Sequence, residues 1–133
     1  VDDIESNRRM LREILENENI IDERILKSFE IGISYQSDID KAMGFIKEEV
    51  LKHPDFMDTR TEEEITEGKP EVTVRVVEVG EYALKLKAWI WVKDPATAYN
   101  MGCDLNKSVK ERFDLEGIEI PYPHRTITQT KSL

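Results

Sequence analysis

The chain has 133 residues, of which 39% are hydrophobic and 35% charged, and 28 acidic against 19 basic side chains give a net charge of −9. Length and apolar content predict one compact domain with a single core and exclude a disordered chain. A pI near 4.8 argues against a nucleic-acid backbone as the main partner. The longest apolar runs span a few residues, far short of the ~20 that cross a bilayer, so we expect neither a signal peptide nor a membrane anchor here.

The negative charge is concentrated in the first half of the chain. Residues 1–71 contain 20 acidic and 10 basic side chains, whereas residues 72–133 contain 8 and 9. Part of the excess lies in residues 55–71, where Glu62, Glu63 and Glu64 are adjacent. Such runs usually form solvated loops or exposed faces, which is the interpretation we prefer. The alternative is a surface that attracts cations, which would matter if several copies lined one cavity.

A strand followed by a helix is predicted in the first half. Apolar and polar residues alternate from 29 to 35 with the period of a half-buried strand. Ser37 or Asp38 then offers an N-cap oxygen. Four apolar residues recur on one helical face: Ile39, Met43, Ile46 and Val50. The helix should end before Pro54, because the residue preceding a proline is driven from the helical region, and a charged ring on His53 would complement the helix dipole there.

Two further strands are predicted after a long polar loop. Residues 55–71 include Gly68 and Pro70 and are typical of a surface loop. The valines of residues 72–79 alternate with one slip, which indicates a β-bulge or a twisted edge, and Gly80-Glu81 is a plausible tight turn. In the strand over 84–92, aliphatic residues form one face. The other face carries lysines and tryptophans: Lys85, Lys87, Trp89, Trp91 and Lys93.

A second helix and a last strand complete the pattern. The helix follows Asp94, with Pro95 or Thr97 near its start and Gly117 placed to cap its end. Its apolar face contains Ala98, Gly102, Leu105, Val109 and Phe113. Residues 118–130 predict an edge strand, because Pro121 and Pro123 each remove a hydrogen-bond donor. The order β-α-β-β-α-β predicts an α+β, ferredoxin-like fold with two helices on one face of a four-stranded antiparallel sheet.

That layout leaves the second face of the sheet bare, with Trp89 and Trp91 on it. Aromatic side chains of this size bury ~150–250 Å² each, so their exposure to water is costly. Lysine stems of the same chain could cover part of the rings. The alternative, which we favour, is that a partner covers them, since tryptophan is enriched at interface centres. A second copy of the chain is the simplest partner, and Lys87, Trp89 and Trp91 are then interface residues.

Residues capable of chemistry are sparse. His53 and His124 are the only histidines and lie far apart in the sequence, so we expect no metal site. Cys103 is the only cysteine, lies inside the second predicted helix and is expected to be a packed or half-exposed thiol. No nucleophile elbow and no glycine-rich phosphate loop is present. We therefore expect neither a catalytic residue nor a cofactor, and we do not expect an enzyme.

Several segments resemble a known family in the family's own order. Residues 29–40 (FEIGISYQSDID) are similar to the opening of the C-terminal cytoplasmic domain of small-conductance mechanosensitive channels. Similar segments follow at 51–54 (LKHP), 76–80 (VVEVG) and 86–92 (LKAWIWV). The most specific is 117–126 (GIEIPYPHRT), similar to the family's Gly-Ile-x-x-Pro-x-Pro-Gln ending, with His124 in place of the usual glutamine. The resemblance covers residues 28–128.

The resemblance implies a function that composition alone does not. Members of this family are homo-oligomeric channels of the cell membrane, usually heptamers, that open under tension and release solutes during osmotic downshock. Their C-terminal domains form a hollow cytoplasmic cage that prefilters ions and influences desensitisation. The end of the chain commonly joins copies in a small parallel barrel, which makes Thr126 and Thr128 expected interface residues within 126–131. The pore-lining and sensor helices are absent from this sequence, so the membrane would be reached through other segments.

Residues 1–27 are predicted to be an arm distinct from the domain over 28–133. Five aliphatic residues follow a helical stripe: Ile4, Leu11, Ile14, Ile21 and Ile25. Residues 7–10 nevertheless resemble the family's Asn-x-x-Leu segment, near the end of a preceding β-rich domain. We favour a helical or irregular arm that packs on a neighbour.

Two other functions stay open at this point. Ferredoxin-like sheets often bind small molecules between copies, so a ligand-sensing regulatory module is the alternative. A small enzyme is disfavoured because no nucleophile and base occur together. The fold alone cannot separate these classes of function.

Overall fold

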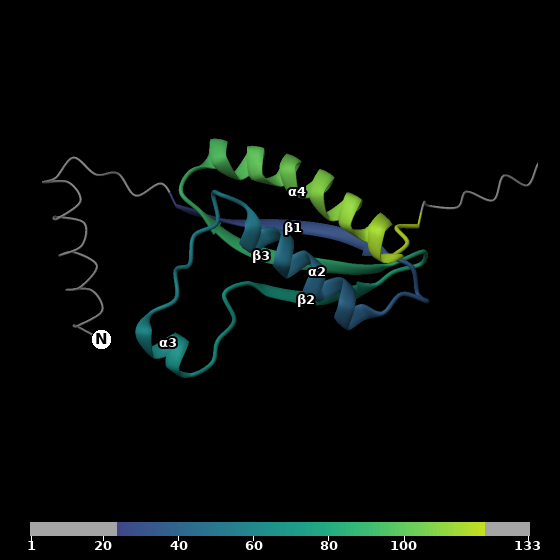
Figure 1. Ribbon diagram of the computed structural model, residues 1–133, viewed down its shortest axis with the longest axis horizontal. Helices are drawn as coiled ribbons and strands as arrows, with labels where there is room; N and C mark the ends of the chain where they lie inside the picture. Colours follow the sequence, from purple (N-terminus) through teal and green to yellow (C-terminus); the bar gives the residue numbers. More distant parts are fainter. Residues whose placement is uncertain (1–23, 122–133) are drawn as a thin grey trace, which may run out of the picture.

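The computed structural model describes residues 24–121, which form a three-stranded antiparallel sheet with two long helices over one face (Figure 1). The elements in chain order are β1 (Ile25–Ile33), α2 (Ile39–Lys52), α3 (Glu62–Thr66), β2 (Thr73–Val79), β3 (Leu84–Val92) and α4 (Pro95–Glu116). The strand order is β1-β3-β2, so β3 lies in the centre. The α+β class and the β-α-β-β-α order predicted for these residues are confirmed, with α3 as an addition.

The strand register places one face of β3 in the core. β1 pairs with β3 from Ile25 opposite Val92 to Ile33 opposite Leu84. β2 pairs with the other edge of β3, and its register shifts between Val76 and Glu78. This β-bulge lies where the alternation of the sequence slips, as predicted. The core-facing residues of β3 are all buried: Leu84, Leu86, Ala88, Ile90 and Val92.

The helices cover that face, and their periodicity predicts most of the residues involved. Ile46, Val50 and all five predicted residues of α4 are buried, whereas Ile39 and Met43 are only partly buried. Ala42 and Met101 are buried although the periodicity did not indicate them. From α2 the buried apolar residues are Ala42, Ile46 and Val50. From α4 they are Ala98, Met101, Gly102, Leu105, Val109 and Phe113. Together with β1 and β3 they form one apolar cluster. Removal of this apolar surface from water, worth roughly 25 cal/mol per Å², holds the two layers together.

The ends of both long helices follow local chemistry. The Asp38 side chain accepts a hydrogen bond from the Lys41 amide at 3.1 Å, and the Asp94 side chain accepts one from the Thr97 amide at 2.7 Å. Each carboxylate therefore satisfies a free N–H of the first turn. α2 ends at Lys52, ahead of Pro54, and Gly117 ends α4 with a φ of 77°, a left-handed conformation that glycine adopts without strain. These predicted ends are confirmed.

The helix α3 corrects the prediction of a loop without regular structure over residues 55–71. Thr61 and Glu64 form a capping box, in which the Glu64 amide donates to Thr61 Oγ1 at 3.1 Å and the Thr61 amide donates to Glu64 Oε1 at 3.0 Å. The threonine followed three residues later by glutamate is the sequence signal of this motif. The prediction missed this motif because the run of glutamates was interpreted as a solvated loop.

The first strand begins earlier than the alternation indicates. Ile25, which the sequence places on a helical stripe, lies in β1 opposite Val92, so the helical assignment of this residue was wrong. Ladder pairing with the central strand outweighs the local helical spacing. The other members of the stripe lie outside the described residues. The division of the chain near residues 27 and 28 stays a prediction.

The predicted last strand is absent from the part of it that the structure describes. Residues 118–121 belong to no strand. The Ser34 amide donates one hydrogen bond to the Glu119 carbonyl at 2.9 Å, which places this segment beside the end of β1. Residues 122–130, with Thr126 and Thr128, lie outside the described residues. The four-stranded ferredoxin-like layout therefore stays a prediction.

Candidate interaction surface

Both tryptophans project from the face of the sheet opposite the helices. The residues of β3 that alternate with its buried ones point to this side, and register adds their neighbours from β1 and β2. We call this surface the tryptophan face; it consists of Leu26, Ser28, Glu30, Gly32, Thr73, Arg75, Glu78, Lys85, Lys87, Trp89 and Trp91. Its apolar end is open to solvent, because Trp91 is 42% exposed and Leu26, directly opposite it, is 49% exposed.

The two indoles are covered to different degrees by their own chain. The Lys87 ammonium lies 5.5 Å from the centre of the Trp89 ring, a cation–π distance, and Trp89 is half-buried. The alternative that lysine side chains of the same chain cover the rings is therefore correct in part for Trp89. Trp91 remains more exposed and carries the apolar character of the face.

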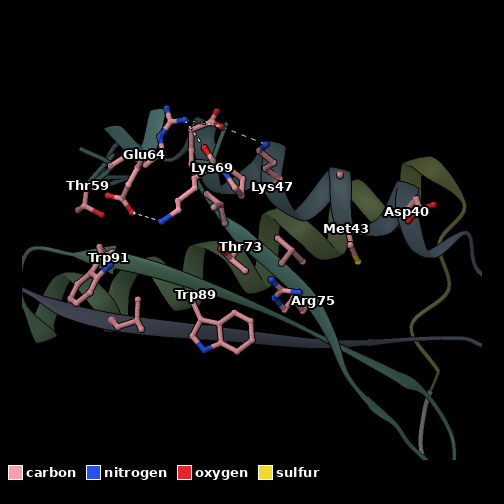
Figure 2. A pocket seen from close by; sticks show the side chains of 17 residues that line it. Asp40, Met43, Lys47, Thr59, Glu64, Lys69, Thr73, Arg75, Trp89 and Trp91 are labelled. Carbon is pink, nitrogen blue, oxygen red and sulfur yellow. Dashed lines mark hydrogen bonds and ion pairs between the residues drawn. The ribbon is translucent and has the colours of Figure 1, made fainter. Parts of the chain in front are cut away.

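A hollow of about 760 Å³ adjoins the tryptophan face where β2 begins (Figure 2). Trp89 and Trp91 line one side. The opposite side is formed by the segment around α3, through Thr59, Glu64 and Lys69. The hollow is a wide notch between the sheet and this segment, so a protein surface fits it better than a small molecule, which needs an enclosing pocket.

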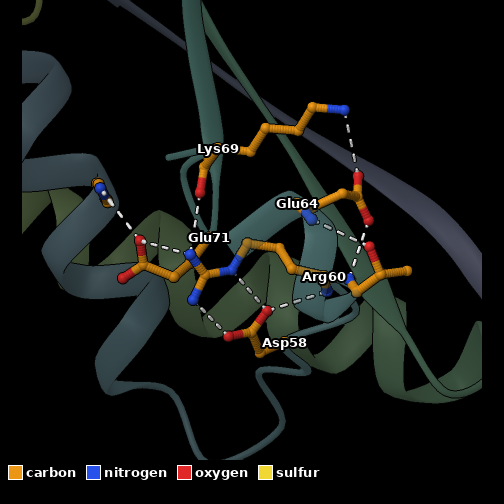
Figure 3. Close-up of polar contacts among 7 residues, drawn as sticks. Asp58, Arg60, Glu64, Lys69 and Glu71 are labelled. Atoms are coloured by element: carbon orange, nitrogen blue, oxygen red, sulfur yellow. Dashed lines mark hydrogen bonds and ion pairs between the residues drawn. The ribbon is translucent and has the colours of Figure 1, made fainter. Parts of the chain in front are cut away.

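The segment around α3 is held by a network centred on Arg60 (Figure 3). Arg60 makes a two-pronged contact with Asp58, from Nε to Oδ1 at 3.0 Å and from NH2 to Oδ2 at 2.8 Å. Its NH1 donates to the Lys69 carbonyl at 2.9 Å and lies 3.9 Å from Glu71. We call Asp58, Arg60, Lys69 and Glu71 the Arg60 cluster. It joins the two ends of the α3 segment, and Lys47, 3.5 Å from Glu71, connects it to α2.

Charge also holds the helix layer together. Arg112 of α4 contacts Glu48 at 2.8 Å and Glu49 at 3.1 Å on α2, and Glu116 at 3.0 Å on its own helix. Burial raises the pKa of Glu49, but hydrogen bonds from Lys52 and Arg112 outweigh this and leave the pKa below its usual value. The guanidinium also lies 4.6 Å from the Phe45 ring centre. These contacts fix α2 against α4.

His53 and Cys103 lie in the helix layer, His53 at the end of α2 and Cys103 within α4. His53 Nδ1 accepts the Asp55 amide at 3.1 Å, so the ring proton lies on Nε2, 2.8 Å from Asp104 Oδ2. The contact with Asp104 ties the end of α2 to α4. Cys103 is exposed on α4. Over residues 24–121, no three histidine, cysteine or acidic side chains are grouped as metal ligands would be; His124 lies outside this range.

A family model described as the C-terminal part of the mechanosensitive ion channel MscS matches residues 27–120. The chain belongs to the MscS family. An uncharacterised MscS family protein of Archaeoglobus fulgidus is 31% identical over 106 residues, which cover 77% of this chain and 33% of the relative. The small-conductance mechanosensitive channel MscMJ of Methanocaldococcus jannaschii is 28% identical over 127 residues, which cover 91% and 32%.

The same family appears in the comparison of folds. The crystal structure of Helicobacter pylori MscS in its closed state superimposes with a TM-score of 0.64 over 83% of this chain and 40% of that one, at 18% identity. At so low an identity, the superposition shows a common fold and nothing beyond it. The chain spans about a third of the length of the curated MscS relatives that it matches. None of the helices within residues 24–121 is both long and apolar enough to cross a membrane. MscS proteins are channels, and these likenesses do not favour a ligand-sensing module.

The structure places only part of the predicted interface. Lys87, Trp89 and Trp91 lie together on the tryptophan face, whereas Thr126 and Thr128 lie outside the described residues. Sequence reasoning missed Leu26 and Arg75, which reach the same face from β1 and β2. Alternation with buried neighbours could have placed each of them on the outer side of its strand. Assigning both to the same face as the tryptophans requires the strand register.

Proposed function

We propose that this chain is the oligomer-forming cytoplasmic domain of a tension-gated MscS channel, which releases solutes on osmotic downshock. In this proposal copies of the domain, seven in the arrangement that the resemblance implies, meet beneath the membrane part and enclose a vestibule that tunes permeation. The supporting observation is the tryptophan face: two tryptophans and a leucine lie on the side of the sheet that no helix covers. A surface of this composition is typical of protein contacts.

Assembly is tested in a channel whose membrane part comes from MscMJ and whose C-terminal third is this chain. We expect chemical crosslinking in membranes, and light scattering after extraction, to report an oligomer. Trp91→Ala should lower the oligomer yield, because it removes the larger of the two exposed apolar side chains, Trp91 and Leu26, on the tryptophan face. The matched control is Leu115→Ala on α4, which is 85% exposed and lies outside the tryptophan face, and it should leave the yield unchanged. A strictly monomeric protein would contradict the proposal.

Channel activity is tested separately by survival of downshock in cells that lack their own mechanosensitive channels. The chimeric channel should restore survival, and Trp91→Ala should reduce it in proportion to the loss of oligomer. Patch-clamp recording at defined tension checks that survival reflects a tension-gated conductance. An assembled protein that neither conducts nor protects would overturn the channel function while leaving the oligomer in place.

A further inference from the structure

The α3 segment, residues 61–67, projects from the body of the molecule. It packs against none of the other helices or strands (Figure 1). The Arg60 cluster nevertheless fixes both of its ends, and the capping box fixes its first turn. It is therefore a small projection held in a defined position. Ordering of this kind without any packing against the core favours contact with another molecule, since little ordering entropy is then lost on binding.

One side of this projection has unused binding capacity. Glu62 and Ile65 are three residues apart in the helix, so they share a face. Ile65 is 50% exposed. The Glu62 carboxylate has no hydrogen-bond or ion-pair partner within residues 24–121. An apolar side chain beside an unpaired negative charge is thus presented to solvent.

The tryptophan face offers the complementary pair. Arg75 lies on this face opposite Lys87, and the next pair on the same face is Thr73 opposite Trp89. In the described part of the chain its guanidinium has no carboxylate partner. The indole of Trp91 and the side chain of Leu26 provide the apolar part. A cation beside exposed apolar groups therefore matches, in charge and polarity, the anion beside an exposed isoleucine.

We propose that the α3 segment of one copy docks on the tryptophan face of the next, with Ile65 against the indoles and Glu62 paired with Arg75. This inference rests on the proposed function, because a closed ring of identical copies needs a contact between two different surfaces of the chain. The α3 segment and the tryptophan face are two such surfaces. The acidic segment is then an interface element rather than a solvated loop.

Thiol trapping tests this contact on the 133-residue chain, in a Cys103→Ser background. One protein carries Ile65→Cys and a second, of different tag length, carries Leu26→Cys. We expect the oxidised mixture to form the mixed disulfide about tenfold more than either protein links to itself, because the contact joins unlike surfaces. The matched control replaces Leu26→Cys by Leu115→Cys. Mixed linking equal to this control overturns the proposal, and so does efficient self-linking of the Leu26→Cys protein, which would indicate a face-to-face dimer.

A charge exchange tests the Glu62–Arg75 pair in the same assay. Glu62→Lys alone and Arg75→Glu alone should each lower mixed linking about tenfold, and the two together should restore it, because the attraction is rebuilt with reversed sign. Glu63→Lys is the control, since Glu63 lies on another side of α3 and should not be rescued by Arg75→Glu. Circular dichroism verifies that each variant is folded. If the chimeric channel assembles but no exchange restores linking, this docking is wrong and the proposed function stands; if the channel itself is monomeric, the proposed function fails.

Discussion

At the scale of single residues, arginines connect parts of this chain that are distant in sequence. Arg112 joins α4 to two glutamates of α2, and Arg60 joins the two ends of the α3 segment. The planar guanidinium suits both tasks, because it presents several donors in fixed directions. Lysine at either position could not satisfy the same set of oxygen atoms.

Arg112→Ala is expected to destabilise the domain by about 2 kcal/mol, since it removes charged hydrogen bonds and leaves the buried Glu49 with Lys52 as its remaining partner. Urea unfolding followed by circular dichroism measures the free energy. The control is Lys107→Ala, whose pair with Glu111 is exposed and 4.0 Å long, and which should change the free energy by no more than ~0.5 kcal/mol. Equal effects of the two variants would show that the Arg112 contacts contribute little.

Asp58 is expected to make the α3 segment sensitive to acid. Hydrogen bonds from Arg60 lower the pKa of this carboxyl from 3.8 to about 2. A pKa lowered in the folded state stabilises above the ordinary pKa, and the effect is lost as pH falls through the folded value. The cluster should therefore hold at pH 4 and loosen towards pH 2.

Pepsin cleavage within residues 55–71 measures this effect, because the protease is active across that range. Wild-type protein should be cut more slowly than Asp58→Asn at pH 4, and the two should be cut at the same rate near pH 2. Glu62→Gln, which alters a carboxylate outside the Arg60 cluster, is the control and should behave as wild type. A constant ratio between Asp58→Asn and wild type at both pH values would contradict the assignment.

At the scale of elements, helix ends are set by single side chains and strand ends by pairing. α4 begins at the Asp94 cap and ends at Gly117, both readable from the sequence. β1 begins at Ile25 because the central strand extends to Val92 opposite it. No residue near position 25 signals that start, since the partner lies far along the chain.

Asp94→Ala is expected to cost about 1 kcal/mol, because the Thr97 amide loses its acceptor at 2.7 Å. Chemical denaturation provides the value. Asn100→Ala, a change at an exposed position within the same helix, should stay within ~0.5 kcal/mol of wild type. A cap variant as stable as this control would mean that water replaces the carboxylate at no cost.

At the scale of the whole molecule, the sheet separates the core, which provides stability, from the face that we propose for assembly. One face of β3 forms part of the core and the other is the tryptophan face, so adjacent residues of this strand lie in different environments. Substitutions on the two faces should therefore have separable effects. The helix layer covers only the first face, which is why the second remains available to a partner.

Ile90→Ala and Trp91→Thr test this separation in adjacent positions of β3. Ile90 is buried among the core residues, and its truncation should cost about 3 kcal/mol of unfolding free energy. Trp91→Thr should cost less than ~1 kcal/mol in dilute monomer while lowering self-association, because its ring is half exposed and threonine suits a strand. Free energies come from urea titration at low concentration and association from light scattering. A large loss of stability in Trp91→Thr would place the ring in the core.

Short-range patterns were sufficient for much of this protein. The sequence alone determined β3, α2 and α4, because each depends on residues that are close together in the chain. These signals are the alternation along β3, the apolar stripes of the two helices, and the caps at Asp38, Asp94 and Gly117. The ordered motifs likewise indicated the MscS family before any coordinates. That the tryptophans lie opposite the core also followed from the two-residue period of a strand.

Only the tertiary structure decided which distant residues meet. The placement of Leu26 and Arg75 beside the tryptophans depends on strand register, and the Arg60 and Arg112 contacts join residues from separate elements. Such partners are selected by the packing of whole layers, a choice that local spacing does not encode. The same reason explains the α3 segment: its capping box is local, but its projection beside the tryptophan face results from how the sheet and α2 hold its two ends.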